Sequence, residues 1–306
     1  MNVPPGERGR VVTSGAGATS LRLARIRAYP LKGAGGFDLS EARLDSLGIP
    51  GDRRWMLVNE TGQFLSQRTH PRLALLRVEP RKDSGDPLGF QVSAPGRKPF
   101  GLAPEDAGGV WRKARLHGEE VKGLEVSGGT GWFSDFLEDP CRLLFFPLES
   151  NRPVDPAFAA GHRTAFSDGY PLHLTTVESL VDLNHRLRDP VDMLRFRPNL
   201  VVTGGTPWEE DRWRVLEVGS VRLHLVKPCA RCAVTTVDQG SGQGGKEPLR
   251  TLGGFRGWEG KAYFGQNVVF RGAGSFRVGE TVRILEEGEV RPPLLRQERR
   301  DPGVPG

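Results

Sequence analysis

Glycine and proline interrupt this sequence so often that long helices are disfavoured along most of its length. The 306 residues include 41 glycines and 24 prolines, about a fifth of the chain. Both residue types end helices, and both are common in the turns that join short strands. A hydrophobic content of 37% is enough for a real core at this length. The composition therefore favours a turn-rich, mainly β fold over a helical bundle.

Alternation of apolar and polar residues predicts strands in both halves of the chain. Residues 21–29 alternate as a half-buried strand does. Residues 55–66, WMLVNETGQFLS, place two apolar runs around a turn in which Gly62 supplies the positive φ, and residues 214–226 form a second hairpin around Gly219-Ser220. Further strands are expected at 73–78, 89–93, 121–126, 267–271 and 281–285.

Helices are expected to be few and short. Residues 132–137 are one candidate, and the segment from Thr175 to the Asp189-Pro190 pair is the other. In the second, the spacing of Thr175 and Glu178 predicts a capping box, and a helical apolar stripe follows. The expected class is mainly β (α+β), with two β-barrel-like domains and a few short helices.

A change in composition near residues 147–155 predicts the domain boundary. The expected organisation is an N-terminal domain at 21–147 and a second domain at 148–287. Residues 1–20 and 288–306 are expected to be a disordered tail and a flexible tail, and DSGDPLG at 83–89 an exposed loop.

The charge balance favours a small-molecule partner over a nucleic acid. The net charge is +6, and no Lys/Arg-rich run of the strength typical of nucleic-acid binding is present. A small anionic ligand would suit this excess. The N-terminus has no apolar signal-peptide region, and no stretch approaches the ~18 apolar residues of a membrane span. A cytoplasmic protein without a membrane partner is therefore expected.

Cysteine is scarce, with Cys141, Cys229 and Cys232 as its three copies. This number excludes a disulfide scaffold and an iron–sulfur cluster held by four thiolates of this chain. The pair in Lys227-Pro-Cys-Ala-Arg-Cys232 is half of a tetrahedral zinc site, but no second ligand pair stands at suitable spacing. Zinc is therefore disfavoured.

Three other interpretations of the pair remain. A redox dithiol would need a helix after the motif, whereas residues 233–237 resemble a strand. A single reactive thiolate is possible, since Lys227 and Arg231 supply neighbouring positive charge. Two buried structural cysteines are the commonest outcome in a cytosolic protein, and on spacing alone this interpretation ranks first.

Six segments spread along the chain carry a resemblance to one known family. In order they read RIRAYPLKG (25–33), GIPGDRRWMLVNETGQFLSQR (48–68), RFRPNLVVTG (195–204), CARCAVTTVD (229–238), KEPLRTL (246–252) and YFGQN (263–267). Together they resemble MOSC-domain proteins with an N-terminal MOSC β-barrel domain, and among these the amidoxime-reducing-component family and its bacterial relatives. Order and spacing match over about residues 21–287. The two expected domains would then be the N-terminal MOSC domain and the MOSC domain.

The resemblance implies a pyranopterin molybdenum cofactor (Mo-molybdopterin), held through its dithiolene and one protein cysteine. Thiolates suit a soft-ligand site of this kind. The metal-ligand cysteine of the family is the second in C-x-R-C, which falls on Cys232, so Cys232 is the expected metal ligand and a catalytic residue. Cys229 becomes a neighbour whose role is open, and Cys141 a buried bystander.

The resemblance also implies ten cofactor-binding positions, with residues 21–54 of the N-terminal domain as candidates for the same site. Their cations and amides suit a phosphate and the pterin edges. The positions are Lys32, Gly33, Arg53, Gly169, Tyr170, Arg197, Asn199, Ala230, Arg231 and Asn267. At Gly33 and Ala230 relatives have Ser, and at Gly169-Tyr170 they have Thr-Ser. Hydroxyl contacts at these positions are either lost or replaced by backbone groups.

Asp238 is a second candidate catalytic residue, because a carboxylate near the metal could supply protons. The alternative, a turn residue before Gly240-Ser241-Gly242, is at least as strong. The six histidines show no metal-ligand spacing, so each is expected to be structural.

The implied function is reduction of N-hydroxylated compounds such as amidoximes, hydroxylamines or N-hydroxy nucleobases. Two electrons from the cofactor would break the N–O bond, so that the amine and water leave. The chain has no C-x₄-C-x₂-C run of the kind found in the ferredoxin domain that some bacterial relatives append. A separate electron donor is therefore expected, either a ferredoxin or a flavoprotein reductase.

Two alternative functions stay open. The chain could be a non-catalytic carrier of molybdenum cofactor or sulfur that uses Cys232. It could also be a thiol–disulfide protein that uses Cys229 and Cys232 together.

Overall fold

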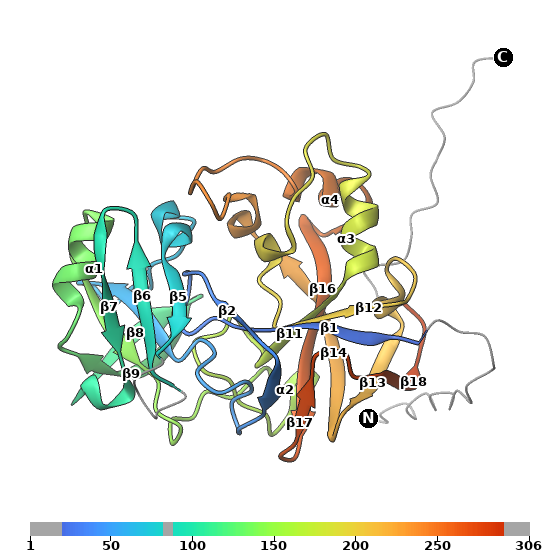
Figure 1. The fold of residues 1–306 in the computed structure, drawn as a ribbon, viewed down its shortest axis with the longest axis horizontal. Helices are drawn as coiled ribbons and strands as arrows, with labels where there is room; N and C mark the ends of the chain where they lie inside the picture. The colour runs from blue at the N-terminus through green and yellow to red at the C-terminus, as the bar shows by residue number, and fades with distance from the viewer. Residues whose placement is uncertain (1–19, 82–87, 291–306) are drawn as a thin grey trace, which may run out of the picture.

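The computed structural model of the protein describes residues 20–81 and 88–290 (Figure 1). Most of the two expected tails and of the expected loop at 83–89 therefore lies outside the described residues. Figure 1 shows two lobes. One contains a large sheet with helices α3 and α4 beside it, and the other contains two smaller sheets and helix α1.

The large sheet is built around the long strands of the C-terminal half. In spatial order its strands are β18 (Val282–Glu287), β13 (Trp213–Val218), β14 (Val221–Arg231), β16 (Lys261–Arg271), β11 (Leu172–Thr176), β12 (Leu200–Thr203), β1 (Arg22–Ala28) and β2 (Phe37–Leu39), and β15 (Gly257–Trp258) pairs with β16. The pair β11–β12 is parallel, and its strands are joined through helix α3 (Val177–Asn184). Buried aliphatic and aromatic side chains on one face form the core of this lobe.

The first two strands of the chain, β1 and β2, belong to this sheet, and Leu23 of β1 pairs with Val202 of β12. The next strand, β3 (Glu41–Arg43), pairs with β17 (Ser275–Arg277) in a separate two-stranded sheet. Residues from the beginning of the sequence thus pair with strands of the C-terminal half. These pairings cross the boundary predicted near residue 147.

The second lobe holds the remaining strands. One sheet has the order β4 (Trp55–Asn59), β10 (Cys141–Phe145), β9 (Glu119–Val126), β8 (Ala107–Leu116), and the other has the order β5 (Arg77–Pro80), β6 (Phe90–Ala94), β7 (Arg97–Leu102). Trp55, at 0% exposure, packs against Phe90 and Phe145, so one aromatic residue joins both sheets.

Helices are short, as expected. The α-helices are α1 (Thr130–Leu137), α2 (Pro156–Ala159), α3 and α4 (Leu249–Phe255); the 3₁₀ turns are η1 (Pro71–Leu75), η2 (Pro104–Asp106), η3 (Met193–Phe196), η4 (Glu209–Asp211) and η5 (Ala233–Thr236). Among the described residues, no helix is both long and apolar enough to span a bilayer.

The mainly β class is confirmed, but closure of the sheets into barrels is not. The large sheet runs from β18 to β2 without pairing between these two ends, and the smaller sheets are likewise open over the described residues. The strand expected at 73–78 is also wrong for its first half. Pro71 starts the 3₁₀ turn η1 there, because its fixed φ suits a first helical position, and β5 begins only at Arg77.

The cap of helix α3 lies one residue later than predicted. Thr176, not Thr175, accepts a hydrogen bond from the Ser179 backbone N–H, while the Thr175 hydroxyl donates to Met193 Sδ. Glu178 does not close a capping box. Its Oε1 accepts hydrogen bonds from Thr203 Oγ1 and Gly204 N, so it ties the helix to the end of β12.

Beside α3, Glu210 is fully buried in η4. Its Oε2 accepts hydrogen bonds from Thr176 Oγ1 at 3.1 Å and Ser179 Oγ at 2.9 Å, while Oε1 has no partner among the described residues. Burial, with the charge of Asp211, raises the pKa of Glu210 to about 7. The folded protein therefore binds this proton more tightly than the unfolded chain does.

This raised pKa predicts that stability decreases with increasing pH. The contribution of Glu210 is fully present below its ordinary pKa of 4.5 and is lost as pH rises through about 7. Glu210→Gln is expected to match the wild type near pH 5 and to exceed its unfolding free energy by up to about 3 kcal/mol near pH 8. Urea denaturation at both pH values, with the neighbouring Glu209→Gln as control, measures this. An equal difference at both pH values would contradict it.

Candidate active site

A pocket of ≈ 270 Å³ lies between the two lobes, where strand ends of the large sheet meet residues 64–68 and His117. Cys232 and all ten of the expected cofactor-binding positions line this pocket. The loop after β1 supplies Lys32 and Gly33, and the turn between η3 and β12 supplies Arg197 and Asn199.

The topology explains why residues so far apart in the sequence meet here. Strands β14, β16, β11, β12 and β1 are consecutive neighbours in the sheet. Gly169 and Tyr170 precede β11, Ala230 and Arg231 end β14, and Asn267 lies within β16. The side chains at these positions therefore lie close together across adjacent strands.

Two glycines near the pocket are required by backbone geometry. Gly33 has a φ of +87°, which glycine adopts without strain, and its carbonyl accepts a hydrogen bond from Gln67 Nε2 at 2.7 Å. Gly265 has a φ of +74°, and a Cβ there would come within 2.5 Å of His173 Nε2. Gly265 thus allows β16 to approach β11 behind the pocket.

Arg53 organises the floor of the pocket. Its Nη1 donates to Asp52 Oδ2 at 2.6 Å and to Asn199 Oδ1 at 2.8 Å, and its Nη2 donates to the Arg197 carbonyl at 3.0 Å. Arg53 and Arg197 both have a positive φ, near +50°, which non-glycine residues rarely adopt. Backbone strain of this kind is typical of sites where side-chain direction matters.

Arg197 is a buried cation with spare hydrogen-bonding capacity. It is 9% exposed, its guanidinium stacks on the Tyr29 ring, and its Nη1 donates to the Ala34 carbonyl. Burial and the neighbouring charge of Arg53 lower the pKa of Arg197 to about 10. Its Nη2 is buried and has no hydrogen-bond partner among the described residues. An anionic or strongly accepting ligand would satisfy this group.

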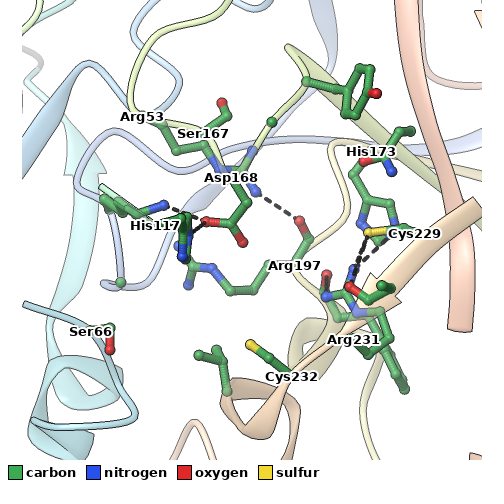
Figure 2. Close-up of a pocket in the computed structure, with 18 of the residues that line it drawn as sticks. Arg53, Ser66, His117, Ser167, Asp168, His173, Arg197, Cys229, Arg231 and Cys232 are labelled. Atoms are coloured by element: carbon green, nitrogen blue, oxygen red, sulfur yellow. Dashed lines mark hydrogen bonds and ion pairs between the residues drawn. The ribbon is translucent and has the colours of Figure 1, made fainter. Parts of the chain in front are cut away.

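Lys32 is engaged by an acid that the sequence analysis did not single out. Its Nζ lies 2.5 Å from Asp168 Oδ1, which also accepts a hydrogen bond from His117 Nε2 at 2.9 Å (Figure 2). Burial works against the charged carboxylate, but Lys32 and His117 outweigh it and hold the pKa of Asp168 well below its usual value. Burial lowers the pKa of Lys32, and Asp168 opposes that shift.

The two cysteines of the motif have different surroundings. Cys229 Sγ accepts a hydrogen bond from Arg231 Nη1 at 2.9 Å, and burial raises the pKa of its thiol. Cys232 follows β14 as the half-buried residue that precedes η5, and Figure 2 shows its sulfur directed toward the open part of the pocket. The strand expected at 233–237 is wrong, because residues 233–236 form η5.

Asp238 does not line the pocket. Its Oδ1 accepts hydrogen bonds from Gly240 N and from Ser241 N and Oγ, and its Oδ2 pairs with Arg195 at 3.0 Å. The bonds from Ser241 lower the pKa of Asp238, so the group stays ionised at neutral pH. This geometry matches the turn-residue alternative and gives no support to proton donation.

Cys141 is buried in the second lobe, where its Sγ lies 3.5 Å from Ser134 Oγ, well away from the motif in the sheet order. Over residues 20–81 and 88–290, no group of three or more His, Cys, Asp or Glu side chains is placed to hold a metal ion.

Some pocket residues were missed by the sequence analysis: Phe64, Ser66, Gln67, Arg68, His117, Ser167, Asp168 and His173. Residues 64–68 end one of the quoted motifs, and Ser167 and Asp168 directly precede Gly169, so both sets had a nearby signal. His117 had none, because it reaches the pocket from the turn between β8 and β9.

Comparisons with known proteins match the chain to two domain families. The MOSC domain family matches residues 161–292, and the MOSC N-terminal beta barrel domain family matches residues 20–140. Human mitochondrial amidoxime-reducing component 1 is 33% identical over 282 residues, which cover 86% of this chain and 82% of that protein. Human mitochondrial amidoxime reducing component 2 is 32% identical over 76% of this chain and 72% of that protein. The molybdenum cofactor sulfurase of rice is 30% identical over 81% of this chain and 32% of that protein.

Proposed function

Because this chain belongs to the family of MOSC-domain proteins that includes the mitochondrial amidoxime-reducing components, we propose that it is a molybdenum-cofactor-dependent reductase of N-hydroxylated compounds. The single observation that carries the proposal is the convergence of Cys232 and ten cofactor-binding candidates on one pocket. Family membership supports an association with the molybdenum cofactor, and the pocket chemistry supports its binding here. The substrate class rests on the similarity to the amidoxime-reducing components.

The residues present fit such a cofactor. Arg197 Nη2 and Arg231 Nε are buried donors without partners among the described residues, as the phosphate and pterin oxygens would require. Cys232 would supply a soft thiolate ligand to the metal of such a cofactor. Asn267 lines the pocket with an amide that can bond to a heterocyclic edge. The Asn199 amide is instead bonded to Arg53, to the His173 N–H and to the Arg27 carbonyl, so it fixes the pocket wall.

When bound, the cofactor supplies the two electrons that break the N–O bond of the substrate. The chain provides the setting for this chemistry. Arg53 holds Asn199 and the Arg197 carbonyl in place, Arg231 ties the Cys motif to the Phe196 carbonyl, and Cys232 points into the space that a substrate could enter. Lys32 is the cation nearest to Asp168, and its ammonium group would help to hold the cofactor phosphate.

The proposal extends to the partners of the reaction. Electrons would come from a separate donor, either a ferredoxin or a flavoprotein reductase, and the substrate would be an amidoxime, a hydroxylamine or an N-hydroxy nucleobase. A cytoplasmic location and the domain limits 21–147 and 148–287 stay predictions of the same proposal.

Elemental analysis tests the proposal directly. Protein made in a host that synthesises the cofactor is expected to contain one molybdenum per chain and to reduce benzamidoxime when electrons are supplied. Protein from a host unable to make the cofactor is the control and is expected to be inactive. A persulfide on Cys232 without molybdenum would contradict the reductase and favour the carrier, the alternative to which the similarity with the sulfurase points.

A further inference from the structure

The pocket carries more positive charge than its own carboxylate can balance. Within the described part of the chain, Asp168 is the one carboxylate that lines it. The lining cations are six in number: Lys32, Arg53, Arg68, Arg197, Lys227 and Arg231. Charge of one sign in a partly enclosed cavity raises the local concentration of ligands of opposite charge. The pocket as a whole therefore attracts anionic molecules.

Four of these cations are engaged by neighbouring groups. Their side chains donate hydrogen bonds to carboxylates or to backbone carbonyls: Lys32, Arg53, Arg197 and Arg231. The proposed cofactor would add a phosphate, which carries up to about two negative charges. The charge of this group is therefore accounted for by the protein and by the proposed cofactor together.

Arg68 and Lys227 are the two cations that remain. Among the described residues, neither side chain makes a hydrogen bond or an ion pair, and each packs against an aromatic ring. Arg68 Cζ lies 5.7 Å from the centroid of the Phe64 ring, and Lys227 Nζ lies 4.1 Å from that of the Phe158 ring. A ring face attracts a cation but does not neutralise it. Both cations thus keep their charge for a ligand in the pocket.

The two cations reach the pocket from different lobes. Lys227 belongs to β14 of the large sheet, where it pairs with Asn267 of β16, another pocket residue. Arg68 follows Phe64, which bridges to Val58 of β4 in the second lobe. Lys227 is half-buried and Arg68 is exposed. Because a partly buried charge is screened less than an exposed one, Lys227 is expected to contribute more to binding.

We propose that the pocket selects N-hydroxylated substrates that also carry a carboxylate, which Lys227 binds with help from Arg68. This inference rests on the proposed function and narrows its substrate class. The carboxylate would form the charge-assisted hydrogen bonds that both cations lack within the described chain. It would hold the end of the substrate away from the N–O bond, so the two cations act on binding and leave the bond-breaking chemistry to the cofactor.

A matched pair of substrates tests the selection. Benzamidoxime is uncharged, and para-carboxybenzamidoxime adds one carboxylate at the far end of the ring. In loaded wild-type protein, kcat/KM is expected to be higher for the charged compound, through a lower KM. Lys227→Met keeps the apolar stem but removes the charge. It is expected to reduce the ratio of the two kcat/KM values about tenfold, the usual effect of losing a hydrogen bond to a charged group.

Two further variants separate the charge from a structural role. Lys227→Arg keeps the positive charge and is expected to keep most of the preference. Lys261→Met is the matched control, at an exposed lysine of β16 outside the pocket, and it is expected to leave the ratio unchanged. Equal ratios in wild type and Lys227→Met would overturn the proposal, and so would a loss of preference in Lys227→Arg as large as that in Lys227→Met.

A second measurement does not depend on turnover. Without an electron donor no reduction takes place, so calorimetry of the loaded protein with para-carboxybenzamidoxime measures binding alone. Binding is expected to be weaker in Lys227→Met than in wild type, and the difference is expected to shrink as salt is added. A difference that salt does not change would contradict the assignment to charge.

The two levels of proposal fail differently. Loaded wild-type protein that binds the charged compound but reduces neither compound would refute the proposed function alone. Loaded wild-type protein that reduces both compounds with equal kcat/KM would refute the substrate selection alone.

Discussion

Replacement of Cys232 by alanine is expected to abolish molybdenum-dependent reduction and to leave the fold intact. The substitution removes the thiolate that we assign to the metal, directly after the end of β14. Since groups that merely orient a metal ligand are worth 10–100-fold, loss of the ligand itself is expected to exceed about 100-fold. The Cys232 side chain makes no cap hydrogen bond in η5, so stability is expected to change by less than about 1 kcal/mol.

Three measurements check this expectation: molybdenum per chain, the rate of benzamidoxime reduction, and urea unfolding. Cys229→Ser is the matched control three residues away, and it is expected to keep both metal and activity. Full activity of Cys232→Ala would overturn the assignment of the metal ligand. Loss of activity in both variants, with the metal retained, would instead favour the thiol–disulfide alternative.

The largest expected loss of stability comes from Arg256, which lies behind the site. Its Nη1 and Nη2 reach the two carboxylate oxygens of Asp211 at 2.6 and 3.0 Å, and Gln266 Nε2 donates to the same carboxylate at 2.9 Å. Both side chains of the ion pair are nearly inaccessible, at 6% and 3% exposure. Arg256→Met leaves a buried carboxylate without its counter-charge, so the unfolding free energy is expected to fall by about 3–5 kcal/mol.

Helix α4, which Arg256 follows as its C-cap, offers the control for this prediction. Arg250 pairs with Glu247, but its side chain is 74% exposed, so Arg250→Met is expected to cost no more than about 1 kcal/mol. Combining Arg256→Met with Asp211→Asn is expected to recover part of the loss, because the stranded charge is then gone. Equal effects of Arg250→Met and Arg256→Met in urea denaturation would contradict the role assigned to the buried pair.

Local pattern was a good guide to the short elements of this fold. The hairpin of β13 and β14 and the first strand follow from alternation, and the abundance of glycine and proline predicts the scarcity of helices. Errors arose where a neighbouring group decided the outcome. Thr176 rather than Thr175 caps α3 because the hydroxyl of Thr175 is bonded to Met193. No local signal reports whether a sheet closes, since that depends on pairing between its two distant edges.

The quoted motifs predicted the pocket residues that lie on the large sheet. The other pocket residues reach the pocket through contacts between segments far apart in the sequence, and a local pattern does not show such contacts. Lys32, Arg197 and Cys232 each lie within a quoted segment. His117 lies in the turn between β8 and β9. It reaches the pocket beside Asp168, which is 51 residues later in the sequence. A histidine without metal-ligand spacing was therefore expected to be structural.

Strand β1 pairs with β12, and β3 pairs with β17, so the pocket can form only after most of the chain has been synthesised. The segment that carries Lys32 is fixed between strands that the ribosome makes some 170 to 250 residues later. Until β12 has been made, the segment of Lys32 and the segment of Arg197 have no common scaffold. The proposed cofactor is therefore expected to enter only after these strands have been made, and a chain truncated before β17 loses the strand that pairs with β3.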